Sequence, residues 1–166
     1  MLPGADLPRI LAASQPMAAL YRAVNTYPHL VAEREHGNPE TSTDAELADA
    51  ARTILDEVYA DQVAELAERF GDLSGQGRTA TDASDLARLS TLGAVDTLLV
   101  DIDASVPGTI DDIGAVSLAD AEGAGNYGVT DEIARRVLLA GGRVLAVRAE
   151  DIPQGGPLAG LLRFVV

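Results

Sequence analysis

The sequence contains no cysteine, and all twelve of its basic residues other than histidine are arginine, so it has no lysine. Without cysteine, the 166-residue chain forms no disulfide, no thiolate metal site and no cysteine nucleophile. Its longest apolar runs, such as 97–100 and 143–147, have the length of strands and are too short to span a membrane. The amino terminus lacks the basic start and the continuous apolar stretch of a signal peptide. We therefore expect a cytoplasmic protein that does not associate with membranes.

Positive charge is scarce, because 26 acidic residues face 12 basic ones and the net charge is −14. Nonspecific binding to nucleic acid depends mainly on contacts between phosphates and Lys or Arg side chains. A chain with this balance is therefore not expected to bind duplex RNA or DNA directly. The acidity also has an ordinary explanation, since a high net charge keeps a protein soluble.

The first forty residues resemble the end of a larger unit. The run 9–13 predicts a short strand, and Ser14 can begin a helix with Pro16 in its first turn. One strand and one helix cannot bury each other, and 25–40 has the Asn, Pro and Gly content of a connector. Residues 1–40 are therefore predicted to be the tail of a preceding domain and a connector.

A long amphipathic helix is predicted over 41–72. Thr43 and Glu46 have the spacing of a capping box, in which each side chain accepts from the other residue's backbone amide. Apolar residues then recur every three or four positions, and Gly71 offers a stop. These residues are Leu47, Ala51, Leu55, Tyr59, Val63, Leu66 and Phe70. At 1.5 Å per residue, the helix is roughly 40 Å long and links the first piece to the rest of the chain.

Strand and helix patterns alternate in the remaining part, which predicts an α/β domain over 79–166. Strands are expected at 95–101, 143–148 and 161–166, with a Gly-rich turn over 155–160 before the last one. Helices are expected to begin at Thr81 and Thr130, each with acidic residues in its first turn. The predicted fold is a three-layer α/β/α sandwich with a mainly parallel or mixed sheet, preceded by the long helix and the strand–helix remnant.

The segment between Ile102 and Gly128 has no helical period and is predicted to be an insertion. Residues 109–110 and 115–118 can form a small hairpin around 111–114. Long excursions at strand ends often carry function in α/β folds, although a plain loop is the alternative. The partner-binding candidates are therefore polar residues at the strand end and in this insertion, namely Asp101, Asp103, Asp111, Asp112, Asn126 and Tyr127.

The pair Asp101 and Asp103 comes directly after an apolar strand and is similar to the Asp-x-Asp-x-Thr motif of haloacid-dehalogenase-type phosphatases. In that motif the first Asp is the nucleophile, the second is an acid/base, and the pair helps to hold magnesium. Such chemistry also needs a cation, usually a lysine, and a later acidic motif. Here Ser105 replaces the Thr, and no lysine is present. The favoured interpretation is two hydrated carboxylates at a strand end, and a magnesium-dependent phosphatase is the alternative.

Other chemical motifs are weak, and we predict no catalytic residues, no metal site and no cofactor. His29 and His36 lie in a polar connector whose acidic residues give no specific metal spacing. The glycine run 75–77 does not come after a strand, and the run 123–128 lacks the strand–loop–helix context of a phosphate-binding loop.

Three stretches carry a resemblance to a known family: TDASDLARLSTLGAVDTLLVDIDA, VTDEIARRVLLAGGRVLAVRAED and GGPLAGLLRFVV. In order, they are similar to helix–strand units and the closing strand of the C-terminal domain of archaeo-eukaryotic class 1 peptide-chain release factors and Pelota. The whole chain resembles the C-terminal half of the bacterial families related to those factors.

The resemblance implies a C-terminal domain that docks a translational GTPase or the ribosome, with 2–27 as the tail of a central domain. Peptide release in the true factors depends on a Gly-Gly-Gln in that central domain, and the chain has no such tripeptide. The resemblance therefore implies a non-enzymatic interaction domain of a translation or ribosome-stress protein.

An apolar face near the amino terminus would pack on a central domain in a full-length relative. Its residues are Leu11, Met17, Leu20, Tyr21 and Val24. Exposed apolar area is unfavourable, so we expect this face to be covered by the long helix or by a second copy of the chain. The sequence therefore predicts a homodimer to which residues 9–30 contribute.

Overall fold

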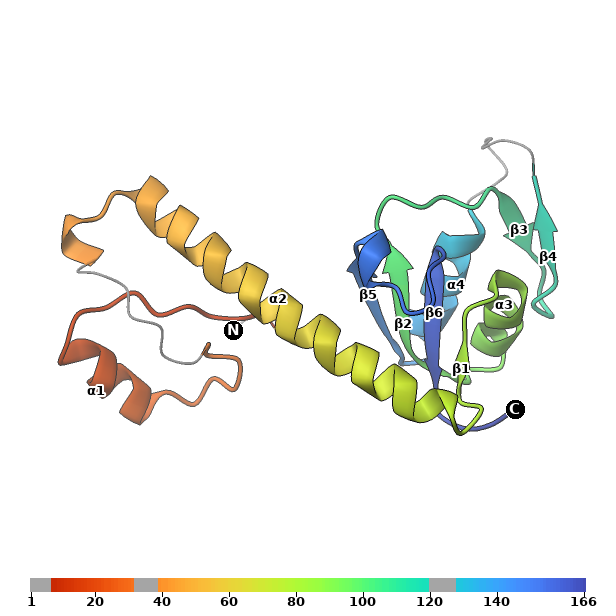
Figure 1. Ribbon diagram of the computed structural model, residues 1–166, viewed down its shortest axis with the longest axis horizontal. Coiled ribbons are helices and arrows are strands. Elements are labelled where there is room, and N and C mark those ends of the chain that lie inside the picture. The colour runs from red at the N-terminus through yellow and green to blue at the C-terminus, as the bar shows by residue number, and fades with distance from the viewer. Residues whose placement is uncertain (1–6, 32–38, 120–127) are drawn as a thin grey trace. The chain divides into compact units, whose positions relative to one another are not determined.

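The computed structural model describes residues 7–31, 39–119 and 128–166 (Figure 1). The chain divides into two compact units, Met1–Gln62 and Val63–Val166. This division falls within helix α2 (Asp44–Ser74), which contributes to both units. The three-part division expected from the sequence stays a prediction.

The first unit contains α1 (Met17–Val24), the short 3-10 helix η1 (Pro39–Thr41) and the first part of α2. A single parallel bridge joins Arg9 to Leu30, with the Arg9 N–H donating to the His29 carbonyl at 2.8 Å. The expected strand over 9–13 is wrong beyond this one residue. Arg9 is held instead by the connector, because its guanidinium lies 4.3 Å from the ring centre of Tyr27.

Helix α2 begins with the capping box that the sequence predicts. The Thr43 N–H donates to a Glu46 carboxylate oxygen at 2.8 Å, and the Glu46 N–H donates to the Thr43 hydroxyl at 3.3 Å. These bonds hold the pKa of Glu46 below its usual value, with the Thr43 backbone bond as the main cause. The helix runs past Gly71 to Ser74 because an isolated glycine is tolerated inside a helix.

The second unit contains a mixed four-stranded sheet in the order β1 (Thr79–Ala80), β6 (Leu158–Leu162), β2 (Val95–Asp101) and β5 (Arg143–Val147). β2 pairs in parallel with β5, whereas β6 is antiparallel to both of its neighbours. The mixed α/β fold is therefore confirmed, and β2 has the bounds that the sequence predicts.

The last strand is misplaced in the sequence prediction. It spans Leu158–Leu162 rather than 161–166, so it occupies the second half of the turn expected over 155–160. Gly160 pairs with Leu98 of β2 on one side and with Ala80 of β1 on the other. A Cβ atom at this position would overlap the Leu86 side chain of the neighbouring helix. The glycine therefore serves a close helix–sheet approach in mid-strand rather than a turn.

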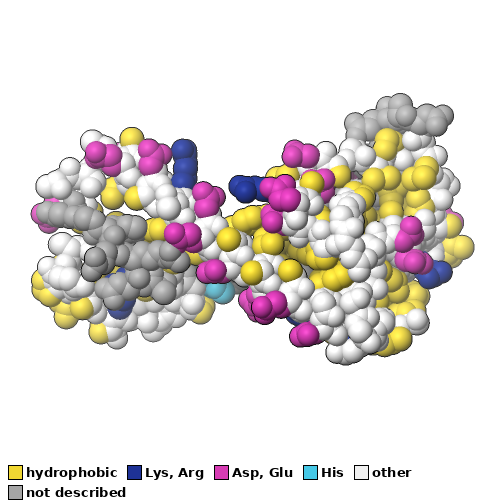
Figure 2. Space-filling view, in the orientation of Figure 1, with side chains coloured by type: hydrophobic (Ala, Val, Ile, Leu, Met, Phe, Trp, Pro, Cys, Tyr) yellow, Lys and Arg dark blue, Asp and Glu magenta, His cyan; other side chains and the backbone are white. Residues whose placement is uncertain are grey.

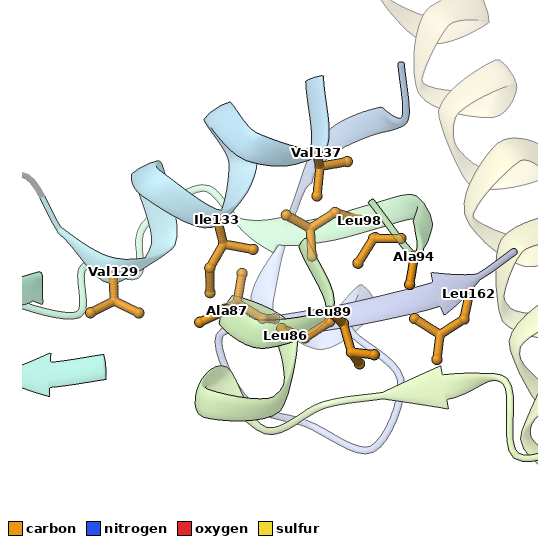
Figure 3. Close-up of a cluster of buried hydrophobic side chains, with 11 residues drawn as sticks. Leu86, Ala87, Leu89, Ala94, Leu98, Val129, Ile133, Val137 and Leu162 are labelled. Carbon is orange, nitrogen blue, oxygen red and sulfur yellow. The ribbon is translucent and has the colours of Figure 1, made fainter. Parts of the chain in front are cut away.

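Helices α3 (Ala83–Thr91) and α4 (Val129–Leu139) pack on one face of the sheet. Figure 3 shows their apolar side chains converging on β2 and β6. This core is built mainly from fully buried aliphatic residues, including Leu86, Ala87, Leu98, Val129, Ile133, Val137, Leu158 and Leu162. The opposite face is buried as well, since Thr97, Leu99, Ala159 and Leu161 are almost inaccessible.

The two helices start differently from the expectation. α3 begins after Asp82, whose carboxylate accepts from the backbone N–H groups of Ser84 and Asp85 at 2.9 and 3.0 Å. α4 begins after Gly128, which has φ 79°, and the expected cap Thr130 is instead a buried residue of the first turn.

The predicted hairpin is confirmed as β3 (Gly108–Ile110) and β4 (Val116–Leu118). No helix in the described ranges is long and apolar enough to cross a membrane.

Gly160→Ala is expected to destabilise the protein by about 1–3 kcal/mol, because the added methyl group must displace a fully buried leucine. Gly71→Ala is the matched control, since a Cβ at that helical position meets no neighbouring atom within 4 Å. It should be neutral or stabilising by about 0.5–1 kcal/mol. Urea denaturation of both variants measures the difference, and equal midpoints would contradict the close approach at Gly160.

Candidate functional site

An open hollow of about 500 Å³ lies where α3 and α4 end, beside the turn of the β3–β4 hairpin. We call it the α3–α4 hollow, and its lining is Ser90, Thr91, Leu92, Gly93, Asp112, Arg135, Arg136, Leu139 and Ala140. The two helix ends are close to each other, because a Cβ at Gly93 would lie 3.7 Å from the Cβ of Ala140. The hollow is therefore formed by three separate segments of the second unit.

Arg136 ties these three segments together. Its Nη1 donates to the Thr91 hydroxyl of α3 at 2.6 Å, and its Nη2 donates to the Ile110 carbonyl of β3 at 3.2 Å. Its Nε donates to the Glu132 carboxylate one turn earlier on α4 at 2.8 Å. Only 13% of the Arg136 side chain is exposed, so these bonds replace most of its hydration.

Glu132 is the anion that balances this largely buried cation. Its second oxygen accepts from Nε of Arg135 at 2.7 Å, while its first oxygen accepts from both arginines. The hydrogen bonds from Arg135, supported by the one from Arg136 and opposed by burial, lower the pKa of Glu132 to about 2. The Glu132 carboxylate is therefore ionised at neutral pH. Its ion pair holds the Arg136 side chain in one conformation at the wall of the hollow.

The hairpin turn is fixed by Asp111. Its carboxylate accepts from the backbone N–H groups of Ile113 and Ala115 at 3.0 and 2.8 Å. At Gly114, which has φ 90°, a Cβ would lie 2.7 Å from the Cα of Arg88 on α3. Only glycine permits this approach of the turn to the helix, and Asp112 thereby reaches the border of the hollow.

Apolar side chains are exposed at the same border. Leu92 is 59% and Leu139 is 74% accessible, although both are large hydrophobic residues. Leu138 is similarly exposed at 58% but does not line the hollow. Figure 2 shows many Asp and Glu side chains and few Arg side chains on the face it presents. An apolar rim around satisfied polar groups is typical of a contact surface for another protein.

Comparison with known proteins gives a family match for the first part of the chain and fold matches for most of it. Residues 1–61 match the family model described as bacterial archaeo-eukaryotic release factor family 11. The C-terminal domain of a peptide chain release factor from Methanosarcina mazei superposes with a TM-score of 0.57 at 18% identity, covering 76% of this chain and 98% of that domain. The chain is similar to archaeo-eukaryotic release factors.

A second solved structure is a model of ribosome-bound archaeal Pelota and ABCE1. Pelota matches with a TM-score of 0.52 at 22% identity, over 90% of this chain and 40% of the Pelota chain. At these identities the two structures establish the fold. No curated protein sequence matches the chain. The resemblance stated from the sequence is confirmed by the family model and by both folds.

The α/β unit places the candidate carboxylates in different settings. Asp101 ends β2 and accepts from the Asp103 backbone N–H at 3.0 Å, which is a local turn bond, and Asp103 is exposed. Asp111 holds the hairpin turn, and Asp112 lines the hollow. Asn126 and Tyr127 lie outside the described residues. In the ranges that the structure describes, no group of three His, Cys, Asp or Glu side chains could hold a metal ion.

Sequence reasoning missed Glu132, Arg136 and the two exposed leucines of the hollow. A signal existed for the ion pairs, because Glu132, Arg135 and Arg136 have the i, i+3 and i+4 spacing of neighbours on a helix. Leu138 and Leu139 also extend the apolar pattern beyond the Ile133–Val137 stripe of the expected helix. The contacts of Arg136 with Thr91 and Ile110 leave no local pattern in the sequence.

Glu132→Gln should lower the free energy of unfolding at pH 7 by about 1–2 kcal/mol, because the largely buried Arg136 loses its anion. The ion pair with the exposed Arg135 is screened by solvent and contributes little. Since the folded-state pKa is depressed, the stabilisation is present above pH 4.5 and is lost as the pH falls towards 2. Urea titrations from pH 7 to pH 3 measure the loss. Glu150→Gln, on an exposed residue, is the control. A deficit that does not shrink in acid would contradict this account of Glu132.

Proposed function

We propose that the chain is a non-enzymatic interaction domain of a release-factor-like protein of translation or ribosome stress. In this proposal the α3–α4 hollow docks on a protein partner, which is a ribosomal protein or a ribosome-bound translational GTPase. The observation that carries it is the exposed apolar border of the hollow, formed by Leu92 and Leu139 around Arg136, whose three guanidinium nitrogens all donate hydrogen bonds. The fold match to a release-factor C-terminal domain supplies the context.

The context of the matched Pelota supports a role at the ribosome. That protein was seen on the ribosome together with ABCE1, and the present chain spans 40% of its length. A role of this kind would place the protein in the cytoplasm, as expected from the sequence. The shared fold suggests the kind of partner, and the α3–α4 hollow identifies the surface of the chain that would bind it.

Charge favours a protein partner over RNA. The net charge of −14 repels phosphate, and the two arginines of the hollow are already engaged with Glu132. About three quarters of the Leu139 surface is exposed, and covering it with a partner stabilises the complex by about 25 cal/mol per Å² of buried apolar surface. The border of the hollow therefore binds better to an apolar protein surface than to a nucleic acid.

The local structure gives no support to a phosphatase. The Asp101 carboxylate bonds the amide of Asp103, as an Asx turn does at many strand ends. Asp103 is exposed, and in the described residues no third carboxylate or histidine joins the pair. We therefore interpret Asp101 and Asp103 as carboxylates at the end of a strand, in agreement with the proposal of a non-enzymatic domain.

Leu139→Asp should weaken binding of the chain to purified ribosomes by about tenfold or more, because a charge replaces an apolar contact at the rim. The matched control is Leu138→Asp, which changes a similarly exposed leucine next to it that does not line the hollow. Co-sedimentation of each protein with ribosomes through a sucrose cushion measures the affinity. Equal effects of the two substitutions, or no co-sedimentation of the unaltered chain, would overturn the proposal.

We also propose that the amino-terminal face mediates a homodimer. Met17, Leu20 and Val24 of α1 are strongly exposed, so the long helix does not cover them. Sedimentation equilibrium should show a dimer for the intact chain and a monomer after Leu20→Glu and Val24→Glu, since charges on this face oppose its burial. A monomeric intact chain, or a variant that dimerises equally well, would sink this idea.

A further inference from the structure

The mixed sheet has two edges that differ in character. The β1 edge is only two residues long, which leaves little backbone for another strand to pair with. The β5 edge is five residues long and has the sequence Arg-Val-Leu-Ala-Val, without proline or a charge after its first residue. In the described part of the chain, no strand pairs with the outer side of β5.

Unpaired backbone groups line this outer side. β5 pairs in register with β2, and the Ile102 N–H donates to the Val147 carbonyl at 3.0 Å, so Val147 directs its backbone towards β2. Backbone direction alternates along a strand, and the N–H and C=O groups of Val144 and Ala146 therefore point outward. Two outward-facing residues offer two donors and two acceptors at the spacing of an added strand.

Arg143 gives the edge a local charge. Eight arginines occur from Val63 onward, all within the described residues. Of these eight, Arg143 is the one whose side chain makes no ion pair or hydrogen bond. In a chain of charge −14, an exposed and unpaired cation is a local site that attracts a carboxylate specifically. An extended segment with an acidic residue at one end would satisfy the backbone groups and this charge together.

We propose that β5 accepts an extended segment of a partner protein as a fifth strand, with a carboxylate of that segment paired to Arg143. Only an extended backbone matches the alternating donors and acceptors of Val144 and Ala146. None of the β5 residues lines the α3–α4 hollow, so this surface is separate from the one in the proposed function. Failure of one proposal leaves the other standing.

The test uses the full chain and the synthetic peptide Glu-Val-Thr-Val-Thr-Val-Glu, whose glutamates at both ends make its direction on the sheet immaterial. Amide NMR shifts are monitored as the peptide is added to millimolar concentration. The proposal predicts saturable shifts concentrated at β5 and its neighbour β2. The same peptide with lysine at both ends should bind several-fold more weakly. The overall charge of −14 would favour the lysine peptide, so a preference for glutamate reports on Arg143.

Two substitutions separate the backbone from the charge. Ala146→Pro removes an outward N–H without breaking the ladder to β2, and it should weaken binding about tenfold. The matched control Ala146→Val keeps the N–H and should bind as the unaltered chain does. Arg143→Glu, on an exposed side chain, should reverse the preference between the two peptides even if the proline variant fails to fold. Shifts outside the sheet, unchanged binding of a folded proline variant, a lysine preference or no binding would each overturn the proposal.

Discussion

The hydrogen bonds of Arg136 are the interaction on which the proposed docking surface depends. One guanidinium joins α3 through Thr91, β3 through Ile110 and α4 through Glu132. An arginine with 13% exposure is stable only when its donors are used, so the three segments must stay in place together. This constraint shapes the hollow, and the hairpin turn held by Asp111 and Gly114 brings Asp112 to its border.

The acidic composition and the arginine pairing support the proposal that this domain binds protein partners. Most of its few cations are committed to internal bonds, which leaves apolar rims and backbone edges as the surfaces able to bind. Such surfaces recognise shape and extended backbone in proteins, whereas nucleic acids require free cations. In our proposal, a fold similar to that of a release-factor C-terminal domain is thus combined with surfaces suited to protein partners.

Local signals predicted much of this fold, and long-range contacts account for what they missed. The capping box at Thr43 acts within three residues, and the strand at 95–101 is an apolar run between clear breaks, so both were predictable. The last strand was misplaced because Gly160 reads as a turn former, although Leu86 of α3 requires it there. The hollow was not predictable, since Arg136 bonds partners 45 and 26 residues away.

Photo-crosslinking at the border of the α3–α4 hollow tests most directly whether the hollow binds a protein partner. Because the chain has no cysteine, Leu139→Cys creates a single attachment point for a thiol-linked photo-crosslinker. On ribosome-bound chain, the account predicts crosslinks to a ribosomal protein or a bound GTPase, and far fewer from Leu138→Cys. Crosslinks to ribosomal RNA alone, or equal yields from both positions, would contradict it.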